Sequence, residues 1–366
     1  MENRYTAVDL FSGCGGLTLG IEAAGFDLRV AVENDPVAAE TYRQNYPRTI
    51  LIEKDICRVN PEEIKKALNG RKISLLVGCT PCQGFCSLTR KWRVEDPRNG
   101  LLLEMARLIR ELVPNAVMME NVPGLASHGI EVFESFLRQL DSQGYYSQYR
   151  IVQMADYGVP QSRRRLVMLA GRGFVIPFPQ PTHARQPEID SSFKRWVSLR
   201  DAIGNMLDPI TFSEAKRNGG PRKFNWHVVR DIQPQTKARL QAAVPGETWL
   251  KISERLRPNC HKGGYKGFTN VYGRMTWDQV AVTITGGSTT ACKGRFGHPE
   301  PKRTTISVRE AALIQTFPKS YKFATDQMDA VCEMIGNAVP PLFAKITGRQ
   351  IKKSLDAHYG ALARAS

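Results

Sequence analysis

The chain has 366 residues, a formal charge of +16 and a hydrophobic fraction of 42%. This apolar fraction is ample for a folded core, so a mainly disordered chain is excluded. No apolar run approaches the roughly 18 residues that a membrane-spanning helix needs, and the first residues do not begin a signal peptide. The eight cysteines are irregularly spaced, unlike those of a secreted disulfide scaffold. We therefore expect a cytosolic protein with reduced thiols and no membrane association.

The positive charge is concentrated in the middle of the chain. Residues 1–170 carry a net charge of +1, residues 171–303 carry +12 and residues 304–366 carry +3. The basic stretch is punctuated by Gly and Pro and contains interleaved aromatic residues, which favours loops over long helices. A nearly neutral half followed by a basic, loop-rich segment suggests a catalytic module and a module that binds a polyanion. Ordinary surface charge is the alternative.

In chain order, the first half alternates between strand and helix patterns. The expected strands cover residues 5–11, 28–32, 73–78 and 116–120, and the expected helices cover residues 17–24, 36–45, 101–112 and 132–140. Residues 150–154 and 165–169 are expected to form a late antiparallel pair. Repeated strand–helix units predict an α/β fold with an open, doubly wound, mostly parallel Rossmann-like sheet.

Polar and glycine-rich segments follow the expected strands. Because ligands bind beyond the carboxyl ends of the strands in such sheets, residues 11–16, 33–35, 78–87 and 120–124 should share one rim. All four segments contain residue types that bind ligands or perform catalysis. Their convergence predicts a functional site at this rim.

A glycine loop, Gly13-Cys14-Gly15-Gly16, lies between the first strand and the first helix. Glycines there permit a tight turn and close approach of a ligand to the backbone. Thr18 occupies the third glycine position of the dinucleotide fingerprint, so a nucleoside ligand is favoured over a pyrophosphate. Glu33, 20 residues after Gly13, can hold both ribose hydroxyls, and the Asp55-Ile56 pair can bind an adenine edge. A purely structural turn is the alternative.

A cysteine loop follows the strand at residues 73–78. The pair Cys79-x-x-Cys82 is compatible with a redox dithiol, with a zinc site or with a single nucleophile. No second cysteine pair or spaced histidine completes four zinc ligands, so no metal is expected. Pro81 fixes the backbone before Cys82, which suits a rigidly presented thiolate that attacks electron-poor carbon. The redox interpretation remains open from the residues alone.

Six motifs then occur in order: DLFSGCGG at residues 9–16, PCQ at 81–83, ENV at 120–122, QSRRR at 161–165, REA at 309–311 and GNAVP at 336–340. Together they resemble the bacterial-type DNA (cytosine-5) methyltransferases over the whole chain except roughly residues 176–270. The resemblance implies a class I methyltransferase fold. It also implies a catalytic and cofactor-binding domain of residues 1–175 completed by residues 320–366, and a loop-rich target-recognition domain and hinge of residues 176–319.

The resemblance implies transfer of a methyl group from S-adenosyl-L-methionine to C5 of a cytosine in a short specific sequence of double-stranded DNA. S-adenosyl-L-homocysteine would be the product. Cys82 would attack C6 of the ring, which activates C5. Glu120 would share or donate a proton at N3, and Arg165, with Arg163 as its partner arginine, would steady the charge that develops at O2.

The resemblance also implies a set of cofactor contacts. Phe11 would stack on the adenine, Glu33 would bind the ribose, and the helix after Asp326 would fold back onto the first domain to close the pocket. The other implied contacts are Ser12, Gly13, Gly15, Gly16, Leu17, Asn34 with Pro36 as its alternative, Asp55, Ile56, Pro81, Leu101, Asn337 and Val339.

The target base lies inside a duplex, so catalysis requires base flipping. Residues 87–99 are expected to close over the flipped cytosine. The expected DNA contacts are Gln83, Ser87, Arg90, Arg98, Arg257, His261, Lys262, Lys266 and Arg274. We expect a monomeric cytoplasmic bacterial enzyme, associated with the nucleoid when acting. It would serve either a restriction-modification system, with a cognate restriction endonuclease, or as a solitary methylase.

Two alternatives remain at this stage. A related branch of the superfamily methylates cytosine in tRNA, but its Cys-Phe-Thr tripeptide is absent from this sequence. The second alternative is a catalytically silent DNA-binding scaffold. It is disfavoured because Cys82, Glu120 and Arg165 are all present.

Overall fold

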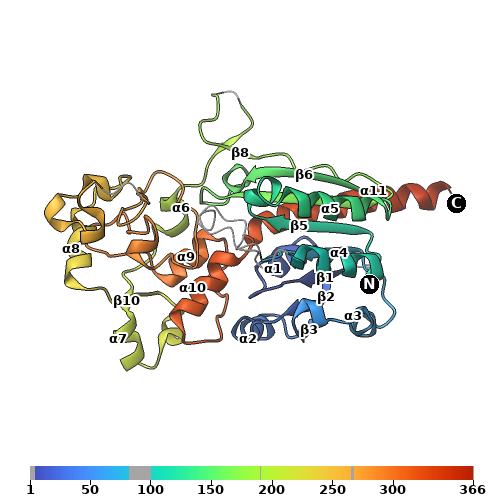
Figure 1. Cartoon of the computed structure of the whole chain (residues 1–366), viewed down its shortest axis with the longest axis horizontal. Helices are drawn as coiled ribbons and strands as arrows, with labels where there is room; N and C mark the ends of the chain where they lie inside the picture. The colour runs from blue at the N-terminus through green and yellow to red at the C-terminus, as the bar shows by residue number, and fades with distance from the viewer. Residues whose placement is uncertain (1–4, 82–99, 190, 265–267, 366) are drawn as a thin grey trace. The chain divides into compact units, whose positions relative to one another are not determined.

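The computed structural model describes residues 5–81, 100–189, 191–264 and 268–365 (Figure 1). The chain divides into two compact units. The first comprises Met1–Tyr157, Arg164–Pro181 and Val339–Ser366, and the second comprises Gly158–Arg163 and Thr182–Ala338. This division differs from the expected domains chiefly at residues 320–338, which lie with the second unit because their helix packs on a helix of that unit.

The first unit is built on a seven-stranded sheet of order β3-β2-β1-β4-β5-β7-β6. Its strands are β1 (Thr6–Leu10), β2 (Asp27–Glu33), β3 (Ile50–Glu53), β4 (Leu75–Gly78), β5 (Ala116–Asn121), β6 (Tyr145–Gln153) and β7 (Arg164–Arg172). The pairs among β1 to β5 are parallel, whereas β7 is antiparallel to both β5 and β6. The expected fold class and the late antiparallel pair are confirmed.

The strand order reverses beside β1. From β1 the chain builds outward through β2 and β3, and it then returns to place β4 on the other side of β1. In doubly wound sheets this switch point opens a crevice at the carboxyl ends of the two central strands. The segments that follow β1 and β4 are the glycine loop and the cysteine loop, so the topology brings the two predicted motifs to one rim.

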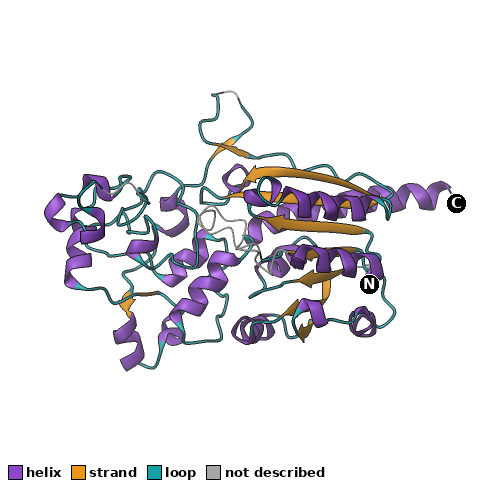
Figure 2. Cartoon of the chain, in the orientation of Figure 1, coloured by secondary structure: helices purple, strands orange, loops and turns teal. Residues whose placement is uncertain are grey.

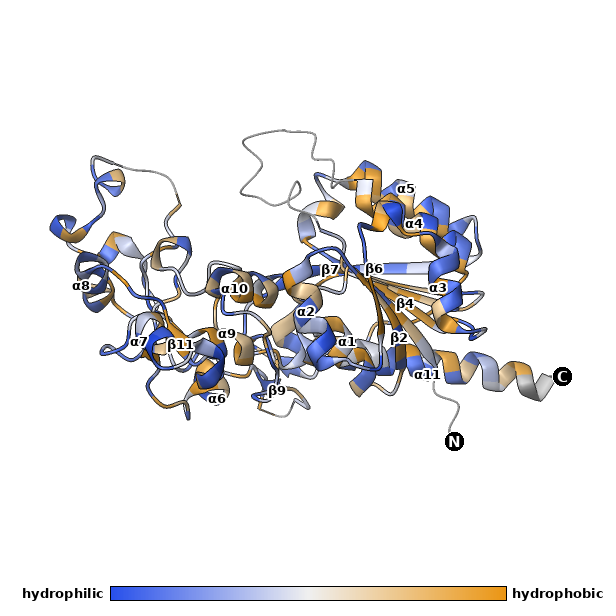
Figure 3. Cartoon of the chain, turned by 90° about the horizontal axis from the view of Figure 1, so that it is seen from below, coloured by the Kyte–Doolittle hydropathy of each residue, from blue (hydrophilic) through white to orange (hydrophobic). Residues whose placement is uncertain are grey.

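Helices cover both faces of the sheet, and the central strands β1, β4 and β5 are buried along their whole length, as in a parallel sheet covered on both faces. The helices of this unit are α1 (Gly16–Ala23), α2 (Pro36–Asn45), α3 (Pro61–Leu68), α4 (Leu101–Leu112), α5 (Ile130–Asp141) and α11 (Pro341–Ala365). One core cluster joins α3, α4 and α5 to alternate strand residues such as Val8 and Leu10. Figure 3 shows the apolar colour concentrated on the strands and on the helix faces toward them.

The C-terminal helix α11 packs on α1. Glycine permits the close approach, because a Cβ at Gly20 would lie 2.4 Å from the Cβ of Ala344. The sequence had assigned the fold-back onto the first domain to the helix after Asp326, which is α10 (Met328–Asn337). In the structure α11 is the helix that packs within the first unit, whereas α10 clusters with the second unit.

The second unit contains little sheet, and most of it is loop (Figure 2). Its elements are β8 (His183–Ala184), β9 (Lys194–Arg195), α6 (Leu199–Ile203), β10 (Ile210–Thr211), α7 (Phe212–Arg217), β11 (Val228–Val229), α8 (Pro234–Ala242), α9 (Val308–Ile314) and α10. A small separate core forms around Trp249 and Ile252. In the described part of the chain, no helix combines the length and apolar character needed to cross a membrane.

Candidate functional site

The glycine loop follows β1 directly and has an unusual backbone. Phe11 has a φ of 59° and Gly15 a φ of 92°, both in the left-handed region that side chains disfavour. The Ser12 amide donates to the carbonyl of Val32 on β2 at 3.0 Å, and the Gly15 amide donates to the backbone carbonyl of Ser12 at 2.8 Å. The loop is therefore bonded to the neighbouring strand, and Gly15 is the N-cap residue of α1. A strained aromatic residue at this rim is typical of a functional site.

Glu33 ends β2 and turns back onto the glycine loop. Its Oε2 accepts the amide hydrogen of Gly13 at 2.7 Å, and its Oε1 accepts those of Asn34 and Asp35 at 2.9 and 2.8 Å. Burial raises the pKa of this carboxyl, and the three amides partly oppose that rise. A carboxylate offers about four acceptor positions, so three amides leave one on Oε2 for a ligand hydroxyl.

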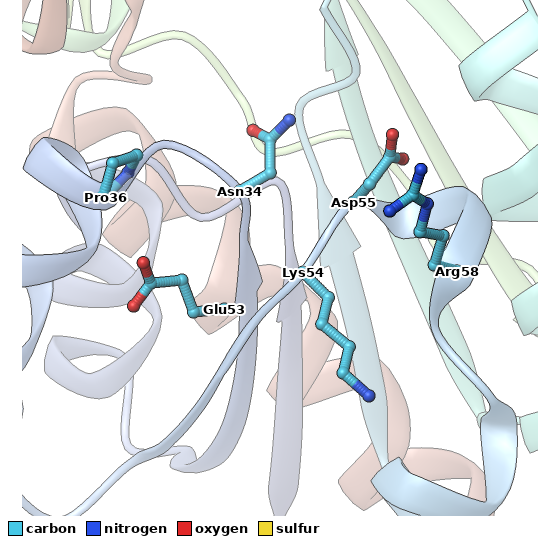
Figure 4. Close-up of a pocket in the computed structure, with 6 residues that line it drawn as sticks. All are labelled: Asn34, Pro36, Glu53, Lys54, Asp55 and Arg58. Atoms are coloured by element: carbon cyan, nitrogen blue, oxygen red, sulfur yellow. The ribbon is translucent and has the colours of Figure 1, made fainter.

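A pocket of about 720 Å³ opens beside this strand end. Its lining residues are Asn34, Pro36, Glu53, Lys54, Asp55 and Arg58, shown in Figure 4. The predicted Asn34 and Asp55 thus lie in one pocket, whose size suits a nucleoside-sized ligand. Lys54 extends away from both (Figure 4) and binds Glu63 at 2.6 Å.

Two features of the loop fit a polar ligand. The Ser12 hydroxyl is buried and has no hydrogen-bond partner within the described parts of the chain. A buried polar atom without a partner is costly, and a ligand group can supply the missing bond. At Gly13, a Cβ would meet no atom within 4 Å, so the loop leaves open space beside its backbone. Together with the remaining acceptor position of Glu33, these groups fit a ligand with ribose hydroxyls and a polar tail.

Glu120 lies at the end of β5, beside Arg165 on β7. Arg165 Nε lies 3.1 Å from Glu120 Oε1, and the two side chains are only 16% and 3% exposed. The other carboxylate oxygen, Oε2, accepts a hydrogen bond from the Cys79 thiol at 2.8 Å. The structure therefore brings together two of the four predicted catalytic residues, and it adds Cys79, which the sequence had left as a possible redox partner.

The cysteine loop is anchored beside Glu120. Asn121 donates through its side-chain amide to the Thr80 hydroxyl at 2.8 Å, and both residues are buried. This bond joins the residue after Glu120 to a residue two positions before Cys82. Cys82 itself lies outside the described residues, as do the predicted DNA contacts Gln83, Ser87, Arg90 and Arg98 and the predicted closing loop.

Arg163, predicted to act with Arg165, is placed differently. It belongs to the second unit, is 2% exposed and donates to the carbonyls of Ile284, Gly336 and Ala338 at 3.0, 3.1 and 3.2 Å. Its predicted catalytic role beside Arg165 stays a prediction, and its present contacts are with backbone carbonyls. A guanidinium that donates to three backbone carbonyls stabilises the fold by joining the segments that carry them.

The remaining predicted cofactor residues vary in exposure. Phe11 and Leu101 are half-buried and pack on the edge of the core cluster, whereas Ile56 is buried within it. Gly16 and Leu17 are buried in the first turn of α1, and Pro81 is exposed. Val339 is buried in the first unit, and Asn337 is exposed at the end of α10 in the second.

Arg274, predicted to contact DNA, lies in the interior of the second unit. Its side chain is 1% exposed and donates to five carbonyls, at distances up to 3.1 Å. These carbonyls belong to Leu240, His298, Glu300, Pro301 and Arg303. Arg274 therefore replaces the backbone pairing that this loop-rich region lacks.

Two further DNA candidates have internal contacts. His261 is buried and stacks on Trp249 with ring centroids 4.5 Å apart. Arg257 donates to the carbonyls of Ile252 and Leu250, both at 2.9 Å, and lies over the same tryptophan ring. Lys262 is exposed, so it is the candidate here that is open to a phosphate. Lys266 lies outside the described residues.

Sequence reasoning missed three pocket residues, Glu53, Lys54 and Arg58, and one contact of Glu120, the carboxylate predicted to be catalytic. Glu53 ends β3 and Arg58 lies just beyond it, so the rule that strand ends share a rim could have found Glu53. The contact between Cys79 and Glu120 spans 41 residues and leaves no local signal. Among the described residues, no group of three or more potential metal ligands is assembled.

Comparison with known proteins gives a consistent picture. The family described as C-5 cytosine-specific DNA methylase matches residues 5–353. The type II methylase M.HgiDII of Herpetosiphon aurantiacus is 39% identical over 354 residues, which cover 95% of both chains. The type II methyltransferase M1.HphI of Haemophilus parahaemolyticus is 30% identical over 95% of this chain and 87% of its own.

Solved structures share the fold at lower sequence identity. A structure described as a DNA modification methyltransferase encoded within a prophage (E. coli) has a TM-score of 0.71 and 24% identity, with 96% of this chain and 99% of that chain covered. The DNMT2 of Spodoptera frugiperda has a TM-score of 0.61 and 20% identity, with 96% and 99% covered.

Proposed function

The chain belongs to the C-5 cytosine-specific DNA methylase family, and from this premise we propose that Cys82, Glu120 and Arg165 carry out the methylation of a cytosine in duplex DNA. The observation that carries the assignment is the buried pair of Glu120 and Arg165, 3.1 Å apart at the rim. Burial of this pair is costly unless both members are satisfied, so a fixed carboxylate and guanidinium at a ligand rim favour a catalytic role.

Family membership implies S-adenosyl-L-methionine as cofactor, and the rim residues fit it. The cofactor supplies an activated methyl group when bound. Glu33 would accept a ribose hydroxyl through the remaining position on Oε2, and Asn34 and Asp55 would face the adenine from the pocket. Ser12 would use its buried hydroxyl to bind the methionine portion.

The chemistry needs an activated C5, because this carbon is a weak nucleophile in cytosine. The Cys82 thiolate would add to C6 and move electron density to C5, N3 and O2. Glu120 would share or donate a proton at N3, while Arg165 would steady the charge at O2. After C5 accepts the methyl group, it loses its proton and Cys82 leaves by elimination.

The pair is also arranged to keep Glu120 in one orientation. Arg165 forms an ion pair with Oε1, which accepts no hydrogen bond among the described residues, and the Cys79 thiol donates to Oε2, so the carboxylate is contacted from two sides. Preorganised groups of this kind need little rearrangement as charge develops, which is a main source of rate enhancement. Cys79 would thus act as a positioning residue for Glu120.

The substrate class is double-stranded DNA with one cytosine flipped out of the helix, recognised within a short specific sequence. The relatives' names as type II methylases and methyltransferases support service in a restriction-modification system with a cognate endonuclease. We propose that the protein acts as a monomer and that it is located in the bacterial cytoplasm.

Methyl transfer from labelled cofactor to duplex DNA and to tRNA tests this proposal. We expect transfer to duplex DNA alone, and none by Cys82→Ala. A duplex with 5-fluorocytosine should trap the protein covalently, because fluorine blocks the final elimination. Transfer to tRNA alone would overturn the proposed substrate, and failure of an active enzyme to be trapped would remove Cys82 from its role.

A further inference from the structure

Tyr42 on α2 and Tyr46, the C-cap residue directly after this helix, reach the glycine loop and the start of α1. The Tyr46 hydroxyl donates to the carbonyl of Gly15 at 2.7 Å, and the Tyr42 hydroxyl lies 2.9 Å from that of Thr18. Both tyrosines are buried, and their ring centroids are 4.7 Å apart. Residues four positions apart lie on the same face of a helix. Tyr42 and the C-cap residue Tyr46 therefore hold the loop at two points from the C-terminal end of α2.

Thr18 continues this contact into the sheet. Its hydroxyl donates to Asp9 Oδ2 at 2.6 Å, so the hydrogen shared by Thr18 and Tyr42 comes from the tyrosine. All three side chains are fully buried. The resulting chain of hydrogen bonds runs from Tyr42 through Thr18 to Asp9 on β1, the strand that leads into the loop. The departure from the glycine fingerprint at Thr18 thus provides a hydroxyl that joins α2, α1 and β1.

The same helix begins at the pocket. Asp35 caps α2 by accepting from the amides of Val37 and Ala38, both at 2.8 Å. Asn34 and Pro36, which flank this cap, line the pocket. A continuous ten-residue helix therefore connects the pocket to the two tyrosines that hold the glycine loop.

We propose that Tyr46 and the Tyr42–Thr18–Asp9 chain are positioning residues that hold the glycine loop in its cofactor-binding conformation. This inference rests on the proposed binding of S-adenosyl-L-methionine at the rim. None of these side chains needs to touch the cofactor. They fix the Gly15 carbonyl and the first turn of α1, and without them the loop spends less time in the competent conformation. Apparent affinity falls in proportion to that fraction.

The first test compares Tyr46→Phe with a matched control, Tyr145→Phe, in the full chain. Tyr145 is also buried, at 1% exposure, and its hydroxyl donates to the Pro114 carbonyl at 2.5 Å. Each variant loses one buried hydroxyl bonded to a carbonyl, so both should lower the free energy of unfolding to a similar extent. Only Tyr46→Phe should raise the Kd for S-adenosyl-L-homocysteine, measured by titration calorimetry, by about two- to tenfold.

The outcomes separate the two proposals. If the wild-type chain binds S-adenosyl-L-homocysteine and the two variants bind it equally well, the positioning role is overturned. If the wild-type chain does not bind it at all, the proposed cofactor site fails instead.

A second test uses Thr18. Thr18→Val keeps the shape of the side chain and removes the hydroxyl, whereas Thr18→Ser keeps the hydroxyl. We expect Thr18→Val to raise the KM for S-adenosyl-L-methionine, with a smaller effect on kcat, and Thr18→Ser to restore the wild-type KM. A serine variant as defective as the valine variant, or a loss confined to kcat, would contradict the inference.

Discussion

The two units use buried charge in opposite ways. In the first unit the buried ionisable side chains at the rim are carboxylates: Asp9, Glu33 and Glu120. In the second unit the most deeply buried ones include, beside Glu310 and His298, three arginines, Arg163, Arg274 and Arg309, each at most 2% exposed. The carboxylates accept hydrogen bonds from a hydroxyl, from backbone amides or from a thiol. The arginines donate mainly to backbone carbonyls.

The difference follows from how each backbone is satisfied. Sheet ladders and helices pair the polar backbone groups of the first unit, so a buried side chain there is available for a ligand or for catalysis. The second unit has only two-residue strands and many loops, whose carbonyls need other donors. A guanidinium group offers five N–H donors. Part of the +12 charge of residues 171–303 is therefore used to hold the unit together rather than to bind DNA.

The largest expected effect comes from Arg274→Ala. Removal of this guanidinium leaves five carbonyls without their donor, and we expect the second unit to lose about 3–5 kcal/mol of stability, as for a broken buried ionic network. Four of the five tryptophans, at positions 196, 226, 249 and 277, lie in that unit, so their fluorescence during urea unfolding reports on it.

Arg274→Lys is the matched control for charge. A lysine keeps the charge but has three donors on one nitrogen, so it should recover little of the lost stability. Full recovery by lysine would mean that net charge, rather than the carbonyl network, stabilises this region, and the contrast between the units would weaken.

Asp9→Asn should reveal a pH dependence of the first unit. The pKa of Asp9 is raised from 3.8 to about 7, chiefly by burial; the hydrogen bond from Thr18 opposes this rise and the charge of Glu33 adds to it. The folded state therefore holds a proton that the unfolded chain releases, and stability falls as pH rises from about 4 to 7. The slope is at most about 1.4 kcal/mol per pH unit. In the Asp9→Asn variant this part of the slope should vanish, as measured by urea unfolding between pH 4.5 and 8.

The buried His298 should give the second unit the opposite slope. Burial lowers its pKa from 6.5 to about 3, helped by Arg303, Arg274 and His227, although Glu310 Oε1 lies 4.0 Å from its Nε2. Below pH 6.5 His298 is protonated in the unfolded chain but stays neutral in the folded one. Stability therefore falls as pH falls, by at most about 1.4 kcal/mol per pH unit.

His298→Asn tests this while keeping an acceptor for the Glu300 amide, which now donates to Nδ1 at 3.0 Å. Tryptophan fluorescence during urea unfolding from pH 4.5 to 7 should show a flatter profile for the variant. An unchanged profile would show that His298 is not the group that titrates.

Sequence periodicity was informative where structure is local. The helix bounds of α2 and α4 match the predicted ranges 36–45 and 101–112, and the strand rule brought Glu33, Glu120 and the two loops to one rim. Neither periodicity nor the strand rule could predict that Arg274 is buried, because the carbonyls that it binds lie 24 to 34 residues away along the chain in irregular segments. Thr18 was noticed only as a missing glycine, since its partners Asp9 and Tyr42 become neighbours through the fold.

The smallest expected effect on stability comes from Lys262→Ala. This variant tests whether an exposed lysine of the basic segment contacts DNA. Lys262 is exposed, so its loss should change the free energy of unfolding by no more than about 0.5 kcal/mol. If it contacts a phosphate, DNA affinity should fall by a similar factor for cognate and unrelated duplexes, and the salt dependence of binding should decrease by about one charge. Fluorescence anisotropy at several salt concentrations measures both quantities. A loss confined to the cognate duplex would instead identify a base contact, whereas an unchanged salt dependence would assign Lys262 to the charge that does not face DNA.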